Sequence, residues 1–334
     1  MKAAVLEENN KLIYKEVPNP RLSAGEVLLK IKACGICSSD FSRVLNNGAY
    51  IYPIILGHEF SGEIIDCASD VDTTLIGKKA VVYPLLPCKE CEFCKEKLYA
   101  QCKKYSYFGS RQNGAMAEYI AVPAWNLKLV PDELSYIVAA MCEPTAVAIH
   151  SVNKINNIND KQVCIIGTGI IGIISGLYAK DLGANVTFMV RNDAKKTFLK
   201  ELKFNNFISD DTNNSYDCVI ECVGSNSSIN TSLKITKSHG QIVLVGNPAE
   251  NVVELLKNNY WKILRSEINL LGVWNSSYKN SSYDDWDMAI EFLCKQQNII
   301  QKLITHKYKL EDGLKAFTLN QDNKLRIKGV FINE

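Results

Sequence analysis

The chain has 334 residues, 47% hydrophobic and 22% charged, with a formal net charge of +2 at pH 7. This length exceeds one ordinary core, so we expect two domains of a globular protein. The small net charge favours neither nucleic acid nor a membrane surface as a partner. The longest apolar run, 163–177, is interrupted by four glycines and is too short to span a bilayer.

The N-terminal sequence turns charged at Glu7 and Glu8 and has no apolar segment typical of a signal peptide. Twelve cysteines in such a chain indicate reduced thiols rather than a disulfide framework. We therefore expect a cytoplasmic protein. Five of the cysteines belong to metal-binding patterns, and the others are expected to be small buried apolar residues.

Up to about residue 130 the sequence has short β segments separated by Gly and Pro. Strands are predicted at 26–33, 60–67, 79–83 and 117–122. Helical spacing follows over 134–152, where Pro144 suits an early helical position.

Strands and helices then alternate. The predicted strands are 163–167, 186–190, 217–222, 241–246 and 268–273, and the predicted helices are 170–182, 193–202 and 227–237. This alternation predicts a doubly wound parallel sheet. From about residue 284 we expect a helix, a strand at 305–309, a short helix and a final strand at 327–333, which would fold back onto the first domain.

Four cysteines are clustered within residues 88–102. They are Cys88, Cys91, Cys94 and Cys102, with the spacing C-x2-C-x2-C-x7-C. Thiolates at this spacing can reach one ion while the backbone turns around it, which predicts a closed, tetrahedral structural zinc site. The alternatives are a CxxC redox pair or unrelated surface thiols. A zinc-finger DNA module would have a basic helix beside the lobe, and the sequence has none there.

A second set of potential metal ligands comes from separate segments. Cys37 and the pair His58-Glu59 offer sulfur, nitrogen and oxygen. Glu143 offers a further oxygen, although a carboxylate is also ordinary at a helix start. Mixed ligation of this kind suits a catalytic zinc with an open position, which lowers the pKa of a bound hydroxyl. Ser39 is placed to take that hydroxyl's proton; the alternative is a serine in a turn.

A glycine-rich turn connects the predicted strand 163–167 to the predicted helix 170–182. Its sequence is Gly167-Thr168-Gly169-Ile170-Ile171-Gly172. After a strand and before a helix, such glycines let backbone N–H groups and the helix N-terminus meet a pyrophosphate. The turn therefore predicts a dinucleotide site, the alternative being a glycine-rich turn without a ligand.

The following strand ends without the acidic residue that NAD-binding domains place against the ribose hydroxyls. The sequence there is Phe188-Met189-Val190-Arg191-Asn192. Arg191 can instead accept a 2′-phosphate, which favours NADP(H) over NAD(H). If Arg191 is only solvated, NAD(H) binds with one contact fewer.

In these features the chain resembles the zinc-containing medium-chain dehydrogenase/reductase family over its whole length, and within it the polyol dehydrogenase branch. The narrower likeness is carried by Asn47-Gly48-Ala49, Tyr52-Pro53 and residues 84–88, 108–111 and 262–265. The resemblance implies a GroES-like, β-rich catalytic domain at 1–145 with its zinc lobe at 88–102. It also implies a Rossmann coenzyme-binding domain at 146–285 and a tail, 286–334, that returns to the catalytic domain.

The same resemblance implies roles for individual residues. Cys37, His58 and Glu59 would be ligands or near-ligands of the catalytic zinc, with Glu143 close to that metal and Ser39 hydrogen-bonded to the reacting alcohol. Coenzyme contacts are implied beyond the glycine-rich turn: Lys195 near the adenosine ribose, Arg326 near the pyrophosphate, and Val273, Trp274 and Asn275 on the nicotinamide side. Such proteins are typically homodimers or homotetramers.

Two positions depart from the family pattern. Ser42 replaces a relay histidine five residues after the zinc cysteine, so the proton must leave by another route. Val190 replaces the ribose carboxylate, so coenzyme choice cannot be copied from NAD-using relatives. Arg43 and Arg111 are the candidate cations for a substrate phosphate, although solvated surface arginine is the commoner role for each.

We therefore expect a zinc-dependent dehydrogenase with two zinc ions per chain that transfers a hydride between a nicotinamide and a polyol or polyol phosphate. The expected substrate is galactitol 1-phosphate, oxidised to a ketose phosphate. The alternatives are an NADPH-dependent ketose-phosphate reductase and an unphosphorylated sorbitol-type polyol dehydrogenase. A zinc-stabilised binding protein without chemistry, or a zinc-independent enone reductase, would not need Cys37, His58 and Glu59.

Overall fold

The computed structural model describes residues 1–46, 48–209, 215–248, 250–280, 282–318 and 325–333. The chain forms two compact units, one of Met1–Pro144 with Ser277–Glu334 and the other of Thr145–Ser276. In chain order the second unit is thus inserted into the first, and helix α4 (Cys142–Val152) carries the chain across the first boundary. Asn47 of the family resemblance and residues 319–324 and 334 of the expected tail lie outside the described residues.

The first unit is mainly antiparallel. Its strands are β1 (Lys2–Glu8), β2 (Lys11–Glu16), β3 (Glu26–Ile36), β4 (Ile54–Ile55), β5 (Glu59–Cys67), β6 (Lys79–Val82), β7 (Leu85–Leu86), β8 (Ser106–Tyr107), β9 (Tyr119–Pro123), β10 (Leu127–Leu129), β17 (Ile304–Tyr308) and β18 (Lys328–Ile332). The main sheet has the order β10-β6-β5-β3-β18-β17, with β9 also paired to β3, and β1 lies between β2 and β4 in a second sheet. Alternate residues are buried along most of β3, as expected of a strand with one face on a core.

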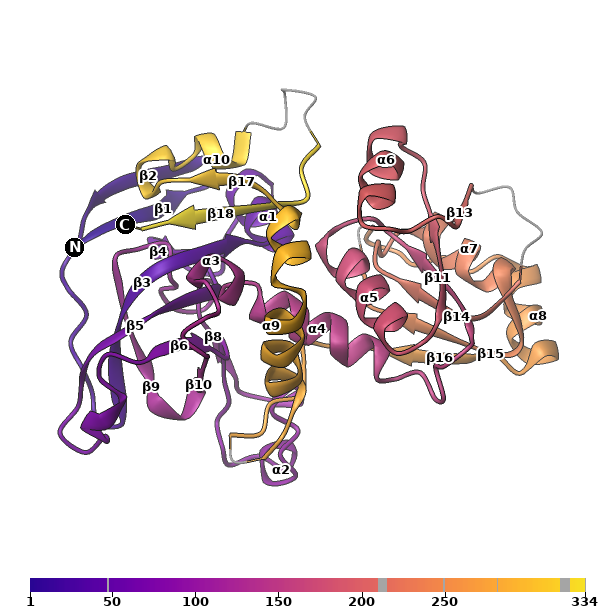
Figure 1. Cartoon of the computed structure of the whole chain (residues 1–334). Coiled ribbons are helices and arrows are strands. Elements are labelled where there is room, and N and C mark those ends of the chain that lie inside the picture. Colours follow the sequence, from indigo (N-terminus) through magenta and orange to yellow (C-terminus); the bar gives the residue numbers. More distant parts are fainter. Residues whose placement is uncertain (47, 210–214, 249, 281, 319–324, 334) are drawn as a thin grey trace. The chain divides into compact units, whose positions relative to one another are not determined.

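The C-terminal part of the chain contributes two strands to this sheet. β18 pairs antiparallel with β3 and parallel with β17. In Figure 1 the yellow strands β17 and β18 accordingly lie beside the early strands of the same unit. One of the last strands is therefore a direct neighbour of one of the first.

Helices of the first unit are short except for one. They are α1 (Ser38–Leu45), α2 (Glu92–Lys95), α3 (Tyr136–Ala139), α9 (Asp285–Leu303) and α10 (Lys315–Thr318), with 3-10 turns at Thr73–Leu75, Tyr99–Gln101, Ala124–Asn126 and Leu310–Asp312. The helical spacing predicted over 134–152 corresponds to two helices, α3 and α4, rather than one. Pro144 lies in the first turn of α4, where its missing N–H has no intrahelical partner to lose.

The second unit confirms the predicted doubly wound parallel sheet. Its strands β11 (Gln162–Ile166), β12 (Asn185–Met189), β13 (Phe207–Ile208), β14 (Tyr216–Glu221), β15 (Thr236–Leu244) and β16 (Asn269–Gly272) have the order β13-β12-β11-β14-β15-β16. All of their pairings are parallel. Helices α5 (Ile170–Asp181) and α6 (Asp193–Glu201) flank one side and α7 (Asn226–Ile235) and α8 (Lys257–Ser266) the other (Figure 1). Of these helices, α8 was not predicted.

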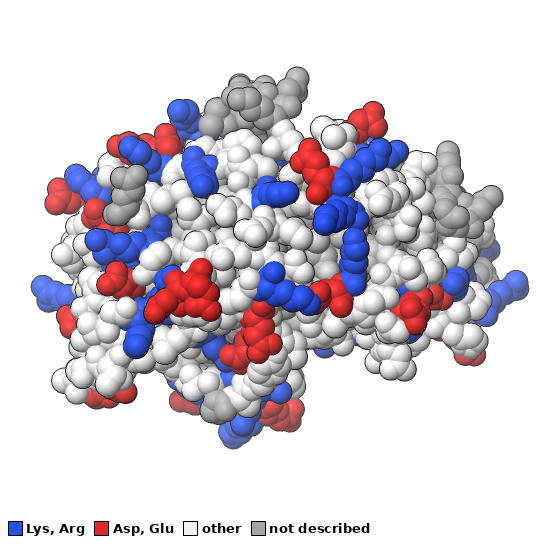
Figure 2. Space-filling model, viewed as in Figure 1, with Lys and Arg blue, Asp and Glu red and all other residues white. Residues whose placement is uncertain are grey.

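Acidic and basic side chains are interspersed over the face displayed in Figure 2. That distribution agrees with the small net charge of the sequence. Among the described residues we find no helix with the length and apolar character that crossing a membrane requires.

Candidate metal centres and coenzyme site

The four cysteines of the lobe converge on one point. Their sulfurs lie within 4.8 Å of one another, and three of the separations are 3.9 Å (Cys88–Cys94), 3.6 Å (Cys91–Cys94) and 4.0 Å (Cys91–Cys102). These distances are far too long for disulfides, and all four cysteines are free. Four thiolates bound to zinc at about 2.3 Å would lie about 3.8 Å apart, so the lobe fits that ion.

Backbone N–H groups in the lobe favour thiolates. Those of Glu90 and Cys91 lower the pKa of Cys88, and those of Lys103 and Cys94 lower the pKa of Cys91 to about 6. Burial raises the pKa of Cys94 to about 12, which a positively charged ion at the centre would offset.

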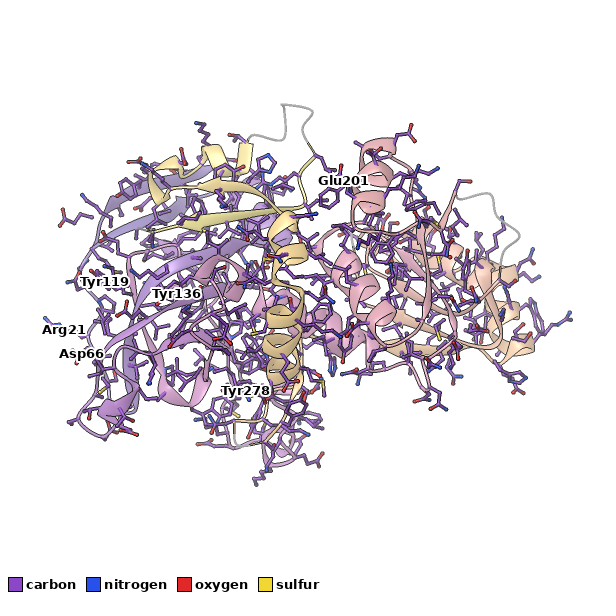
Figure 3. The ribbon with its side chains drawn as sticks, in the orientation of Figure 1. Arg21, Asp66, Tyr119, Tyr136, Glu201 and Tyr278 are labelled. Atoms are coloured by element: carbon purple, nitrogen blue, oxygen red, sulfur yellow. The ribbon has the colours of Figure 1, made fainter. Side chains whose placement is uncertain are left out.

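The lobe is attached to the rest of the first unit through aromatic side chains. Tyr278, labelled in Figure 3, stacks on Tyr83 with ring centroids 4.3 Å apart and donates a 2.6 Å hydrogen bond to the carbonyl of Trp125. Trp125 in turn contacts Tyr99 and the Nζ of Lys89, both from the lobe. The lobe therefore connects strands of the first unit to the segment that leads into α9.

The second predicted metal cluster also forms. Ligand atoms of Cys37, His58 and Glu59 lie within 4.8 Å of one another. Cys37 caps α1, and Glu59 is the first residue of β5, directly after His58. His58 and Glu59 are buried. A soft thiolate, an imidazole and a carboxylate whose ligand atoms converge in this way fit zinc with an open position.

Asp40, which the sequence analysis missed, lies beneath this cluster. It is fully buried, accepts a 3.0 Å hydrogen bond from the N–H of Cys37 and lies 3.7 Å from Nδ1 of His58. Although burial opposes the charged imidazolium, the negative charges of Asp40, Cys37 and Glu143 raise the pKa of His58 to about 10. The pocket is thus strongly attractive to a cation, which a bound metal would supply in place of the proton.

Glu143 faces the same pocket from the first turn of α4. Burial raises its pKa to about 7, although His58 opposes the shift. Its Oε1 accepts a 3.2 Å hydrogen bond from the hydroxyl of Tyr107, and the ring of Tyr107 packs edge-on against His58. Tyr107 was also missed by the sequence analysis.

Lys328 is the third residue that the sequence did not reveal. It is buried at the start of β18, and its Nζ forms an ion pair with Oε2 of Glu59. Glu59, Cys37 and Glu143 raise the pKa of Lys328 against the effect of burial, so its ammonium is charged.

Ser39 and Arg43 lie one turn apart on α1. Nη1 of Arg43 donates a 2.8 Å hydrogen bond to Oγ of Ser39 and a 3.3 Å one to Asp40. The guanidinium therefore already has two partners beside the metal cluster. Arg111 lies in the turn after Tyr107, where its guanidinium is held over two aromatic rings, 4.7 Å from the centroid of Tyr50 and 4.3 Å from that of Tyr105.

The glycine-rich turn in the second unit has three glycines with distinct requirements. Gly167 has φ +106°, which disfavours any other residue. A Cβ on Gly172 would collide with the carbonyl of Gly167, so this glycine lets α5 approach the turn. A Cβ on Gly169 would meet nothing within 4 Å, which leaves open space beside the N-terminus of α5. This combination is typical of a dinucleotide-binding turn.

The other predicted coenzyme residues are divided between the two units. Arg191 follows β12, where its Nη2 lies 3.3 Å from Oγ of Ser227, and Lys195 lies on α6, where burial lowers its pKa. Val273, Trp274 and Asn275 follow β16 in the same unit.

Arg326 belongs to the first unit and lies just before β18. Its guanidinium packs 4.3 Å from the ring centroid of Phe41 and 5.8 Å from that of Tyr308, and both terminal nitrogens are buried without a hydrogen-bond partner among the described residues. An anion is the ordinary partner of such a group.

Comparison with known proteins agrees with this arrangement. Residues 23–132 match the family described as alcohol dehydrogenase GroES-like domain, and residues 171–295 match the family described as zinc-binding dehydrogenase. The chain is 32% identical to galactitol 1-phosphate 5-dehydrogenase of Escherichia coli K12, with 87% of this chain and 88% of that protein covered. It is 30% identical to D-arabitol-phosphate dehydrogenase of Enterococcus avium, over 95% and 93% of the two chains.

A solved structure shows the same likeness in three dimensions. The crystal structure of galactitol-1-phosphate dehydrogenase from Escherichia coli superimposes with a TM-score of 0.91 at 30% sequence identity and covers 100% of both chains. The GroES-like and Rossmann-type folds expected from the sequence are therefore confirmed.

Proposed function

Because the chain belongs to the zinc-containing medium-chain dehydrogenase/reductase family, in its polyol dehydrogenase branch, we propose that it oxidises a polyol phosphate to a ketose phosphate. The enzyme class, an NAD(P)-dependent alcohol or polyol dehydrogenase acting on a small molecule, follows from that membership. Galactitol 1-phosphate is the proposed substrate. The same site run in reverse would reduce a ketose phosphate with NADPH, and a sorbitol-type polyol is the unphosphorylated alternative.

The observation that supports this function most is the convergence of Cys37, His58 and Glu59 in one buried pocket. We propose these three as ligands of a catalytic zinc, with Glu143 beside them, and the four lobe cysteines as ligands of a structural zinc. When bound, a catalytic zinc supplies Lewis acidity toward the substrate oxygen. A non-catalytic binding protein would not need this mixed set of donors.

The protein groups around the pocket have complementary tasks. Ser39 accepts the proton of the substrate hydroxyl, while its own hydrogen bond from Arg43 keeps Oγ oriented. Because Ser42 replaces a relay histidine, the proton leaves Ser39 by a route other than an imidazole at that position. When bound, a nicotinamide coenzyme would supply the hydride acceptor, so that a secondary alcohol would become a ketone.

Of the two proposed phosphate ligands, Arg111 has the guanidinium that is more available for an anion. The rings of Tyr50 and Tyr105 orient its guanidinium, whereas Arg43 is already bound to Ser39 and Asp40. We expect Arg111→Ala to lower kcat/KM for galactitol 1-phosphate about 10- to 100-fold, because hydrogen bonds to charged groups contribute about 1.5–3 kcal/mol. Unphosphorylated galactitol should be affected less than about twofold.

Steady-state kinetics on a panel of polyols and their phosphates, with NAD and NADP, tests both the function and this residue. Arg43→Ala is the matched comparison, and it should reduce activity toward both substrate classes because it disturbs Ser39. If Arg111→Ala lowered kcat/KM equally for phosphorylated and unphosphorylated substrates, the assignment of Arg111 to the phosphate would be wrong. If the metal-loaded enzyme were inactive toward every polyol and ketose, the proposed function would be wrong.

We propose NADP(H) as the preferred coenzyme. Arg191 follows β12 where an acidic residue would otherwise bind the ribose, and Lys195 adds a second cation on the next helix. Arg191→Ala should lower kcat/KM for NADP about 10- to 100-fold and leave NAD within about twofold, because only NADP carries the 2′-phosphate.

Lys196→Ala is the control. Lys196 lies next to Lys195 on α6, with its Nζ over the ring of Phe207, and its loss should not change the ratio of kcat/KM for NADP to kcat/KM for NAD. A wild-type preference for NAD that Arg191→Ala leaves untouched would contradict the assignment. The remaining coenzyme residues named above, among them Arg326 near the pyrophosphate and Val273, Trp274 and Asn275 near the nicotinamide, are proposed with it.

We propose that the active form is a homo-oligomer, a dimer or a tetramer. Edge strand β16 and the segment before and along α8 expose a set of large apolar side chains: Val252, Val253, Leu255, Leu256, Tyr260, Trp261, Leu264 and Leu270. A patch of this kind at an unpaired strand edge suits a second copy of the chain. Sedimentation of the native protein as a monomer at micromolar concentration would contradict this proposal.

The expected domain limits, 1–145, 146–285 and 286–334, and a cytoplasmic location are proposed as well. The location is supported by the twelve cysteines, all of which are free thiols. A stable disulfide in the protein isolated from its native source would contradict it.

A further inference from the structure

The ion pair between Lys328 and Glu59 is unusual for its burial. Both side chains are only 2% exposed, and the two residues come from opposite ends of the sequence. Lysine is almost never fully buried unless it is paired, and a buried pair carries a large desolvation cost. A group kept at this cost beside candidate metal ligands indicates a task beyond packing.

The sheet is built to let this pair form. On β3, Gly35 pairs with Glu59 of β5 on one side and with Val330 of β18 on the other. A Cβ on Gly35 would collide with Oε2 of Glu59 and approach Cε of Lys328 to 3.1 Å. Gly35 does not have a positive φ, so its backbone does not require glycine. The missing side chain instead opens a passage through which Glu59 crosses the intervening strand to reach Lys328.

We propose that Lys328 is a positioning residue that shares the Glu59 carboxylate with the catalytic metal and so limits how tightly Glu59 binds it. The inference rests on the proposed assignment of Cys37, His58 and Glu59 as metal ligands. Lys328 occupies Oε2, which leaves Oε1 as the oxygen for a metal. An ammonium on the far oxygen withdraws charge from the carboxylate and adds a like charge near the ion, and both effects weaken the carboxylate–metal bond.

This arrangement affects how strongly the metal can bind a substrate oxygen at the ligand position that the protein leaves open. A weakly donating Glu59 leaves the metal a stronger Lewis acid, so that a substrate oxygen can replace or complement the carboxylate. Without Lys328, Glu59 would be a buried and uncompensated anion whose best remaining partner is the metal. The pair therefore predicts that loss of Lys328 tightens metal binding rather than loosening it.

The test uses the full-length enzyme with Co²⁺ in the catalytic site and its visible absorption as the readout. A competing chelator is titrated into wild type and Lys328→Met, and the concentration that removes half of the cobalt is compared. We expect Lys328→Met to require about tenfold more chelator, and its absorption band to shift as the second carboxylate oxygen becomes available. General damage to the fold would move the midpoint the other way.

Lys328→Arg keeps the positive charge and should retain the wild-type midpoint. Lys328→Gln removes the charge with a side chain of similar polarity, so it should behave like Lys328→Met and decides the question if the methionine variant does not fold. An unchanged or lower midpoint in a folded neutral variant overturns the inference. Enzyme that binds cobalt normally but oxidises no polyol would instead contradict the proposed function and leave this result intact.

Discussion

Replacing His58 with alanine is expected to lower kcat/KM for polyol oxidation by at least about a thousandfold. Loss of the imidazole removes one of the three proposed ligands of a metal whose Lewis acidity would contribute several kcal/mol, and a thousandfold corresponds to about 4 kcal/mol. The zinc content of the His58→Ala protein should fall from two ions per chain to one. Steady-state kinetics together with atomic emission on the same preparation measures both.

His239→Ala is the control for His58, because the side chain of His239 is 76% exposed and its Nδ1 lies 3.3 Å from a carboxylate oxygen of Glu267, which is also exposed. It should retain both ions and full activity. A His58→Ala enzyme with two ions per chain and activity within about tenfold of wild type would contradict the assignment of the catalytic centre.

Substitution of Cys94 by serine is expected to have its main effect on stability. Cys94 is buried, and the sulfurs of Cys88 and Cys91 lie within 4 Å of its own. A structural zinc contributes directly to folding free energy. We expect the thermal midpoint of the first unit to fall by roughly 10 °C, which corresponds to about 3–5 kcal/mol in a cooperative unit of about 200 residues. Below the transition, kcat should stay within about threefold of wild type.

Cys294→Ser is the matched control, since Cys294 is a half-buried thiol on α9 outside both clusters. Its midpoint should change by less than about 2 °C, as expected of a substitution that removes no metal ligand. Calorimetry with metal counting distinguishes a role in stability from a role in catalysis. If Cys94→Ser lost activity at an unchanged thermal midpoint, the cysteine lobe would contribute to catalysis rather than to stability.

Several features that the sequence predicted correctly consist of residues that are close along the chain. The four lobe cysteines lie within one short segment, and the glycine-rich turn connects one strand to one helix, so their spacing indicates the geometry. The parallel sheet followed from the same local alternation. By contrast, α8 was not predicted, although it carries the apolar residues Tyr260, Trp261 and Leu264; no residue of this helix is fully buried.

Residues that complete the metal pocket through tertiary contacts were not predicted. Asp40 lies in a short polar helix, where nothing in the sequence indicates its burial. Tyr107 contacts the pocket by donating a hydrogen bond to Glu143, which is distant in sequence. Of the three residues, Lys328 was the easiest to predict from the sequence, since it is the single charged residue in the otherwise apolar strand β18. A charge at such a position indicates a buried partner, but the sequence does not say which carboxylate it is.

The placement of β18 beside β3 has a consequence for how the protein is made. A ribosome releases the inserted unit, Thr145–Ser276, long before it releases the last strand. All segments of that contiguous unit have been synthesised before β18, so the unit can fold during synthesis. Residues 33–36 of β3 can pair with β18 only after β18 has been synthesised. Until β18 has been synthesised, the first unit thus has an open strand edge on β3, and the carboxylate of Glu59 lacks the ammonium of Lys328 as its partner.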